Sequence, residues 1–199
     1  MSVLPPRLAG MATVVLFHSA LGLRPAVHDF ADALRAAGHE VHTPDYYDGE
    51  TFETVEEGVV KRDALGVEEM TRRAGAAVEG LPADLVYAGF SLGAACAQVL
   101  AQTRPGARGV VLMHGCLPPA AVGAPWPAGL PVEIHTHEAD PWCDAAEARE
   151  VAAETGGAAH LYPGETHLFA DADLPDHDPE AAALMLARVT ALLDRVGRA

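Results

Sequence analysis

Short apolar runs alternate with amphipathic segments along most of this chain. Several runs, such as residues 13–17 and 110–113, are continuously apolar and rich in β-branched side chains, which is typical of strands buried on both faces of a parallel sheet. The predicted strands are 13–17, 39–43, 85–87, 110–114, 132–137 and 159–162. The strand 132–137 differs from the others in that apolar and polar residues alternate along it. Tyr46 and Tyr47 follow the second strand and could line a pocket, but we expect them to pack over the sheet edge with their hydroxyls in water.

The segments between these runs have helical periodicity. The first has Pro25 in its first turn and ends before Gly38, and the second is expected to break at Gly58 and Gly66. The predicted helices are 23–37, 53–81 in two pieces, 92–103, 144–155 and 179–196. Strands that alternate with helices predict an α/β domain, with a mostly parallel central sheet and helices on both of its faces.

The stretch from residue 85 to 95 combines a strand, a G-x-S-x-G turn and a helix. This order is typical of a nucleophile elbow, in which a strained turn holds a serine between a strand and a helix. Gly89 and Gly93 fit such a turn, because side chains there would collide with the neighbouring strand or helix. Ser91 is thus the candidate nucleophile, although a serine at this position can also serve only as a helix cap.

Charge and composition exclude several classes of function. The 28 acidic and 13 basic residues give a net charge of −15, which disfavours both nucleic acid and anionic lipid surfaces as partners. No apolar run reaches the roughly 18 residues of a membrane span. Three widely spaced cysteines without a secretory signal peptide point to a reducing cytoplasm.

The length of 199 residues suits one domain. We expect residues 1–11 to be a loose leader and residues 12–199 to form the domain. Translation could begin at Met1 or at Met11.

Two further residues complete a catalytic triad with Ser91. Asp140 and His167 follow the last two predicted strands, so the chain has the order nucleophile, acid, histidine. A serine hydroxyl needs an imidazole to remove its proton, and the imidazole needs a carboxylate to fix its tautomer. The competing candidates are Glu138, Asp144 and residues near Cys116 for the acid, and His18, His114 and His137 for the base.

Metal and cysteine chemistry are the other possibilities. The group His135, His137, Glu138, Asp140 and Cys143 has metal-binding side chains, but alternate strand residues point to opposite faces, so we predict no metal site and no cofactor. The three cysteines Cys96, Cys116 and Cys143 are expected to be buried apolar fillers. His114 and His137 are expected to be hydrogen-bonded packing residues.

With these motifs in place, the chain resembles the dienelactone hydrolase family of the α/β-hydrolase fold over about residues 12–196. The resemblance rests on the compact length without a large lid domain, His18 to Leu23, Pro44 to Tyr47, the elbow, Asp140 and His167 to Phe169. It implies that Ser91, Asp140 and His167 are catalytic, with the backbone N–H groups of Ala20 and Leu92 as the oxyanion hole. Candidate substrate contacts are His18, Ser19, Trp142 and Phe169.

This chain departs from the enzymes that give the family its name. Those enzymes have cysteine at the elbow and a glutamate in the oxyanion loop, where this chain has Ser91 and Ser19. They also bind the substrate carboxylate with an arginine near the catalytic histidine, where this chain has Asp171. We therefore expect a serine esterase acting on a small neutral or cationic ester, lactone or acyl donor, as a monomer or a homodimer. The alternatives are a non-catalytic binding protein with this fold and an acyltransferase using the same triad.

Overall fold

Six strands within residues 10–198 form the central sheet. The computed structural model describes residues 10–198, so most of the expected leader at residues 1–11 lies outside the described residues. The strands are β1 (Thr13–Phe17), β2 (Glu40–His42), β3 (Val86–Phe90), β4 (Gly109–Met113), β5 (Val132–His137) and β6 (Ala158–Tyr162). Their order across the sheet is β2-β1-β3-β4-β5-β6, and every pairing among the described strands is parallel. The predicted α/β architecture is confirmed.

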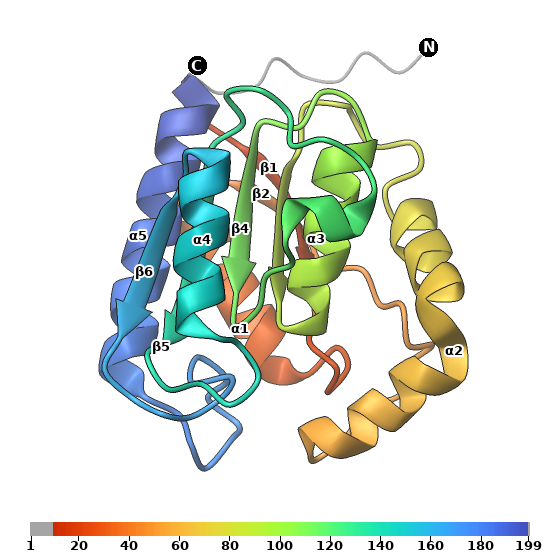
Figure 1. Cartoon of the computed structure of the whole chain (residues 1–199), viewed down its shortest axis with the longest axis vertical. Helices are drawn as coiled ribbons and strands as arrows, with labels where there is room; N and C mark the ends of the chain where they lie inside the picture. The colour runs from red at the N-terminus through yellow and green to blue at the C-terminus, as the bar shows by residue number, and fades with distance from the viewer. Residues whose placement is uncertain (1–9, 199) are drawn as a thin grey trace.

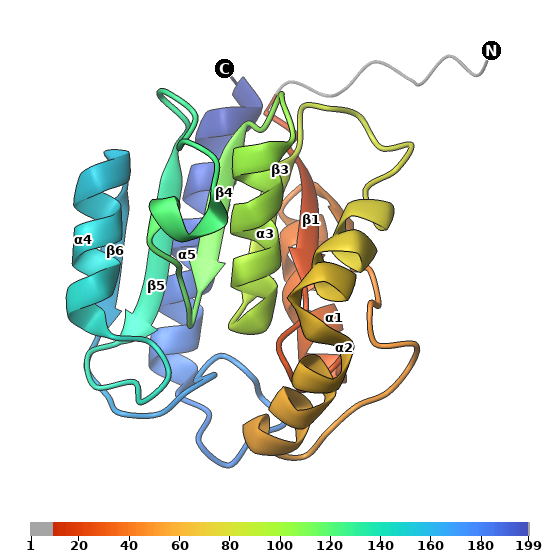
Figure 2. The same cartoon turned by 45° about the vertical axis from the view of Figure 1, so that its right-hand side comes forward.

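The helices form a layer on each face of this sheet. They are α1 (Pro25–Ala36), α2 (Val55–Ala76), α3 (Leu92–Thr103), α4 (Ala145–Thr155) and α5 (Pro179–Arg198), with a short 3-10 turn at Pro119–Val122. Figures 1 and 2 show α2, α3 and α4 on one face, and α1 and α5 on the other. The C-terminal end of α5 lies at the amino ends of the strands, and the loops that follow the strands gather at the opposite end (Figure 1). No large lid domain covers those loops in residues 10–198.

Alternate residues of the strands feed two apolar clusters, one under each helical layer. Val14 and Leu16 of β1 join the cluster under α1 and α5, whereas Val15 and Phe17 join the cluster under α2, α3 and α4. The whole of β1, β3 and β4 is buried, which explains their continuously apolar sequences. None of the helices within residues 10–198 is long and apolar enough to cross a bilayer.

The two predicted breaks in α2 have different outcomes. Gly66 has φ 78° and ψ 160°, so the helix is kinked there as predicted. The break predicted at Gly58 is wrong, because Gly58 is helical. An added Cβ at Gly58 would lie 1.9 Å from the carbonyl oxygen of Ala20. This glycine therefore allows α2 to approach the loop after β1 and does not interrupt the helix.

The expectation for Tyr46 and Tyr47 is also wrong. Both side chains are buried, with exposed fractions of 2% and 0%. The Tyr46 hydroxyl donates a hydrogen bond to the carbonyl of His18, and the Tyr47 hydroxyl donates to the carbonyl of Gly58 at 3.2 Å. The two phenols thus satisfy backbone carbonyls near the loop after β1 and are not in contact with water.

Candidate active site

The turn between β3 and α3 has the geometry of a nucleophile elbow. Ser91 has φ 51° and ψ −112°, and its backbone N–H donates to the carbonyl of Met113 on β4 at 2.7 Å. A Cβ at Gly89 would lie 2.1 Å from the carbonyl oxygen of Gly93, and a Cβ at Gly93 would lie 2.4 Å from that of Phe17. The strained backbone of Ser91 is therefore held by close contacts that only glycine permits on either side.

Three side chains from different loops form one hydrogen-bonded chain. The Oγ of Ser91 lies 2.9 Å from Nε2 of His167, and Nδ1 of His167 lies 2.9 Å from both carboxylate oxygens of Asp140. His167 and Asp140 are buried, with exposed fractions of 9% and 6%. The order and the distances are those that a nucleophile, a base and an orienting acid require.

The carboxylate of Asp140 is held by further donors. The backbone N–H of Trp142 donates to Oδ1 at 2.8 Å, and the hydroxyl of Thr136 donates to Oδ2 at 3.2 Å. The competing acids have other positions: Glu138 is exposed, and Asp144 caps α4 through the backbone N–H of Ala146. Among the acids considered from the sequence, the structure brings Asp140 to His167.

Four non-glycine residues of the described chain have positive φ, and all four follow strands of the sheet. They are Asp48 in the loop after β2, Ser91 after β3, His114 after β4 and Leu168 in the loop after β6, with φ values of 58°, 51°, 59° and 57°. Sparsely populated backbone conformations persist only where the surrounding structure enforces them, and they are concentrated at functional sites. This end of the sheet is thus the strained end of the domain.

The two backbone groups predicted to form an oxyanion hole lie on the loop after β1 and at the start of α3. Among the hydrogen bonds of residues 10–198, none uses the N–H of Ala20 or Leu92 as donor. Ala20 follows Ser19, whose hydroxyl accepts a hydrogen bond from the N–H of Leu21 at 3.1 Å. Ser19 therefore shapes the loop that carries Ala20.

The predicted substrate contacts differ in their accessibility. Trp142 is 48% exposed and lines a cleft beside His167. His18 and Phe169 are 0% exposed, and Ser19 is 4% exposed. His18 stacks on Tyr46 with ring centroids 3.7 Å apart, and Phe169 stacks on His137 at 4.2 Å. The burial of His18 and Phe169 corrects the expectation for both: they are packing residues behind the site, stacked on neighbouring aromatic rings.

His114 is a buried, unpaired histidine next to the site. Its ring centroid lies 5.9 Å from that of His167 and 4.5 Å from that of Phe169. Within residues 10–198 neither ring nitrogen has a hydrogen-bond partner, which corrects the expectation of a hydrogen-bonded residue. Burial lowers the pKa of His114 well below its ordinary value of 6.5, so this ring is neutral and does not oppose a positive charge on His167.

His137 was expected to be hydrogen-bonded and the three cysteines to be buried, and the structure agrees with most of this expectation. Nδ1 of His137 accepts a hydrogen bond from the backbone N–H of Thr166 at 3.2 Å, whereas its Nε2 has no hydrogen-bond partner among the described residues and lies 3.8 Å from Oδ2 of Asp178. Cys96 and Cys143 are buried, and Cys116 is half-buried. Burial raises the pKa of the Cys96 thiol to about 12, which disfavours the nucleophilic thiolate.

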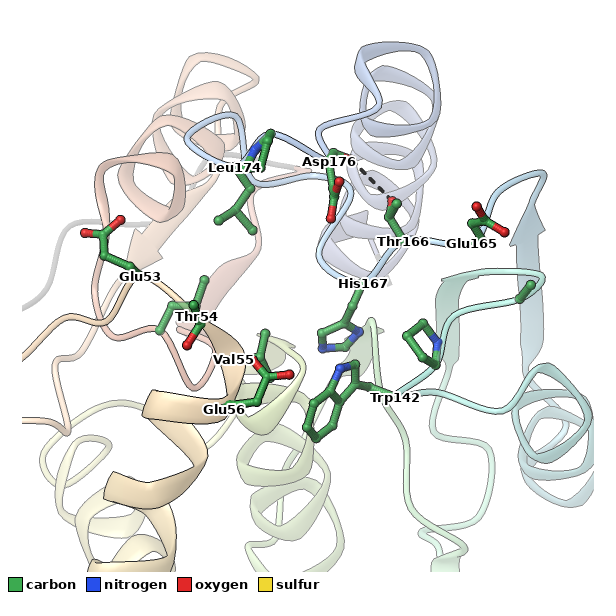
Figure 3. Close-up of a pocket in the computed structure, with 14 residues that line it drawn as sticks. Glu53, Thr54, Val55, Glu56, Trp142, Glu165, Thr166, His167, Leu174 and Asp176 are labelled. Atoms are coloured by element: carbon green, nitrogen blue, oxygen red, sulfur yellow. Dashed lines mark hydrogen bonds between the residues drawn. The ribbon is translucent and has the colours of Figure 1, made fainter.

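The cleft has a volume of about 570 Å³ and lies between α2 and the loops after β5 and β6. Figure 3 shows Glu53 and Glu56 on the α2 side, with Trp142 and His167 on the other side. Its acidic lining residues are Glu53, Glu56, Glu165 and Asp176. No lysine or arginine of the described residues belongs to this lining. The cleft beside His167 therefore carries a negative potential.

The comparison with family models decides the family. The model described as "Dienelactone hydrolase family" matches residues 3–197, which is nearly the whole chain. The chain belongs to the dienelactone hydrolase family. This dienelactone hydrolase family member is a hydrolase that acts on ester bonds. The comparison with curated proteins found no match.

Solved structures show the same fold at low sequence identity. A dienelactone hydrolase-like promiscuous phosphotriesterase from metagenomic libraries has a TM-score of 0.76 and 20% identity, over 93% of this chain and 86% of that one. The dienelactone hydrolase from Anabaena variabilis has a TM-score of 0.67 and 20% identity, over 94% and 87%. A thermophilic esterase from Thermogutta terrifontis has a TM-score of 0.71 and 16% identity, over 94% and 84%. These similarities establish the α/β-hydrolase fold.

The structure shows what Asp171, one of the departures from the family pattern, contacts in this protein. Asp171, which stands where the resemblance implies an arginine, has its Oδ2 3.7 Å from Nε of Arg24. Arg24 is buried at the start of α1 and also donates to the carbonyl of Phe52 at 2.9 Å. Asp171 and Arg24 therefore join the loop after β6 to the loop after β1, and the arginine is paired within the protein.

Proposed function

We propose that this dienelactone hydrolase family member is a serine hydrolase that cleaves small carboxylic esters or lactones. The observation that carries the proposal is the continuous chain of hydrogen-bond distances from Ser91 through His167 to Asp140. Each of these side chains depends on the next one for its role in catalysis. Serine is a weak nucleophile without a base, and imidazole is the side chain whose ordinary pKa suits that role near neutral pH.

The reaction would proceed through an acyl-enzyme. Nε2 of His167 takes the hydroxyl proton of Ser91 while Oγ attacks the ester carbonyl carbon, and the carbonyl π electrons move onto the oxygen. Collapse of this intermediate breaks the bond to the alcohol, which leaves with the proton from His167. Water then attacks the acyl-enzyme with His167 again as base, and the carboxylic acid is released.

The backbone N–H groups of Ala20 and Leu92 would stabilise the negative oxygen in both halves of the reaction. Leu92 is the first residue of α3, where the helix dipole adds positive potential. Neither N–H group is engaged by another acceptor in residues 10–198, so both are available to a developing oxyanion. Donors fixed in advance in this way contribute to catalysis because they need no reorganisation.

The charges around the cleft favour uncharged or cationic esters over anionic ones. Carboxylates of Glu53, Glu56, Glu165 and Asp176 surround the opening, and Nη1 of Arg24 lies 3.9 Å from Glu53 outside the lining. A substrate carboxylate would be repelled by this set, whereas an ammonium group would be attracted. Trp142 adds an aromatic face on which a cation can lie.

The double variant Glu56→Gln with Glu165→Gln tests this charge preference. We expect KM for a choline-type ester to rise by roughly 3- to 10-fold at low salt, because two exposed attractive charges are removed. KM for the uncharged isostere of that ester should change by less than about 2-fold. Steady-state kinetics on both substrates, repeated at high salt, measures the effect. Glu154→Gln on α4 is the control, and an equal rise in KM for both esters would contradict the electrostatic explanation.

Labelling with a fluorophosphonate tests the serine-hydrolase proposal itself. Oγ of an activated serine displaces fluoride from phosphorus, and intact mass then increases by the phosphonyl group. We expect one adduct on the wild type and none on Ser91→Ala or His167→Ala, all three being shown to be folded by circular dichroism. An unlabelled but folded wild type would overturn the proposal and favour a non-catalytic binding protein.

A further inference from the structure

A second cluster of chemically active side chains lies away from the cleft, between the sheet edge and α5. Glu133 and His135 are alternate residues of β5 and share one face, and His160 of β6 is the register partner of His135. Glu133 and His135 are 7% and 0% exposed. None of the three lines the cleft or bonds to the Ser91, His167 and Asp140 chain.

The three side chains converge on one point. Oε2 of Glu133 lies 3.6 Å from Nε2 of His135 and 3.4 Å from Nε2 of His160, and all three atoms lie within 4.8 Å of one another. Each is buried without a hydrogen-bond partner in the described part of the chain. Three inward-facing polar atoms left unsatisfied at one point are costly unless something lies between them.

Outer contacts fix two of these side chains. The hydroxyl of Tyr162 lies 2.9 Å from Nδ1 of His135, and Nη2 of Arg195 on α5 donates to Oε1 of Glu133 at 2.7 Å. The remaining nitrogen of His135 and the remaining oxygen of Glu133 are thereby directed at the common point. Metal-binding histidines and carboxylates in proteins have outer partners of this kind.

We propose that Glu133, His135 and His160 form a Zn²⁺ site. Ligand atoms about 2.0 to 2.1 Å from a tetrahedral Zn²⁺ are about 3.3 to 3.4 Å from one another, close to the two nitrogen–oxygen distances here. Two imidazoles and one carboxylate are a common donor set for this ion. The His160 side chain is 23% exposed at the sheet edge, so the cluster lies close to solvent although its three ligand atoms are buried, and a water that enters with the ion would supply the fourth ligand.

Binding at this site would connect three elements. The ligands come from β5 and β6, and Arg195 extends the set to α5. β6 is at the edge of the sheet, and among the strands of residues 10–198 it has a hydrogen-bonded neighbour on only one side. A bound ion would hold β6 to β5 by side chains as well as by the backbone, so Zn²⁺ should stabilise the protein against heat.

The test is a Zn²⁺ titration of the untagged, chelator-treated protein in competition with a chromophoric chelator at pH 7.5. We expect one ion per chain in the wild type, with affinity lowered by at least about 100-fold in His160→Ala and in Glu133→Gln, and about 10-fold in Tyr162→Phe. His42→Ala is the control, since Nε2 of His42 lies 3.3 Å from Oε1 of Glu40 at the opposite sheet edge, in a two-residue, more exposed pair. The Zn²⁺ affinity of His42→Ala should equal that of the wild type.

Melting temperature provides a second readout. Zn²⁺ should raise the melting temperature of the wild type and of His42→Ala but not that of His160→Ala. Because the side chain of His160 is only partly buried, its replacement by alanine should leave the fold intact, so misfolding would not explain the lost response to Zn²⁺. No stoichiometric binding by the wild type would overturn the proposal. Equal binding by the wild type and His160→Ala would also overturn it, because the ion would then lie elsewhere, for example at the thiols of Cys116 and Cys143.

Discussion

Replacing Asp140 by asparagine is expected to lower turnover by roughly 10⁴-fold and to leave the fold intact. The reason lies in the donors around the carboxylate. The fixed N–H of Trp142 points at Oδ1, so the amide oxygen of asparagine must occupy that position. The amide nitrogen then replaces Oδ2, which faces His167 and the hydroxyl of Thr136. It would donate to Nδ1 of His167 and favour the tautomer with the proton on Nε2, which could then accept nothing from Ser91.

The measurement is the steady-state rate on a short acyl ester, with circular dichroism and thermal melting to verify the fold. Glu138→Gln is the matched control, because Glu138 is an exposed carboxylate two residues away, and its turnover should stay within about 2-fold of wild type. Loss of activity in Glu138→Gln with normal activity in Asp140→Asn would assign the acid role to Glu138.

Replacing Gly93 by alanine is expected to reduce both stability and turnover. The new Cβ would lie 2.4 Å from the carbonyl oxygens of Phe17 and His18, and both belong to backbone that cannot turn aside. Because α3 must move away from β1, we expect the free energy of unfolding to fall by about 3 kcal/mol. A displacement of about 1 Å at Ser91 and Leu92 should cost at least about 100-fold in turnover.

Gly75→Ala is the control for this substitution. Gly75 lies within α2, and an added Cβ there has no atom within 4 Å. We expect the free energy of unfolding of Gly75→Ala to rise by about 0.5 to 1 kcal/mol, because alanine loses less backbone entropy than glycine in a helix. Chemical denaturation of both variants measures the difference. Gly93→Ala with wild-type stability would contradict the close packing of α3 against β1.

The sequence was sufficient to predict the elbow and the order of the strands along the chain. Continuous apolar runs reveal strands buried on both faces, and glycine on either side of Ser91 reveals a turn without room for side chains. Periodicity does not reveal contacts between distant segments. The role of Gly58 beside Ala20 and the burial of Tyr46 against the His18 carbonyl depend on how α2 and its loop fold over β1.

Strand register explains why the Glu133, His135 and His160 cluster was missed. Spacing along one strand groups His135 with Glu133, but His160 lies 25 residues further along the chain, and only the pairing of β5 with β6 places it beside His135. The sequence also did not predict which aromatic side chains near the triad are exposed. The aromatic residues Trp142 and Phe169 both follow candidate triad members, yet one lines the cleft and the other is 0% exposed.

The order of the strands gives the nucleophile and the base unequal local stability. Ser91 follows β3, which has a paired strand on each side, whereas His167 follows β6, which among the described strands pairs only with β5 and is largely half-buried. Local opening begins where few contacts are lost, and an edge strand is such a place. Fraying of β6 would move the imidazole away from an elbow that is still intact, so the catalytic chain would separate before the central sheet unfolds.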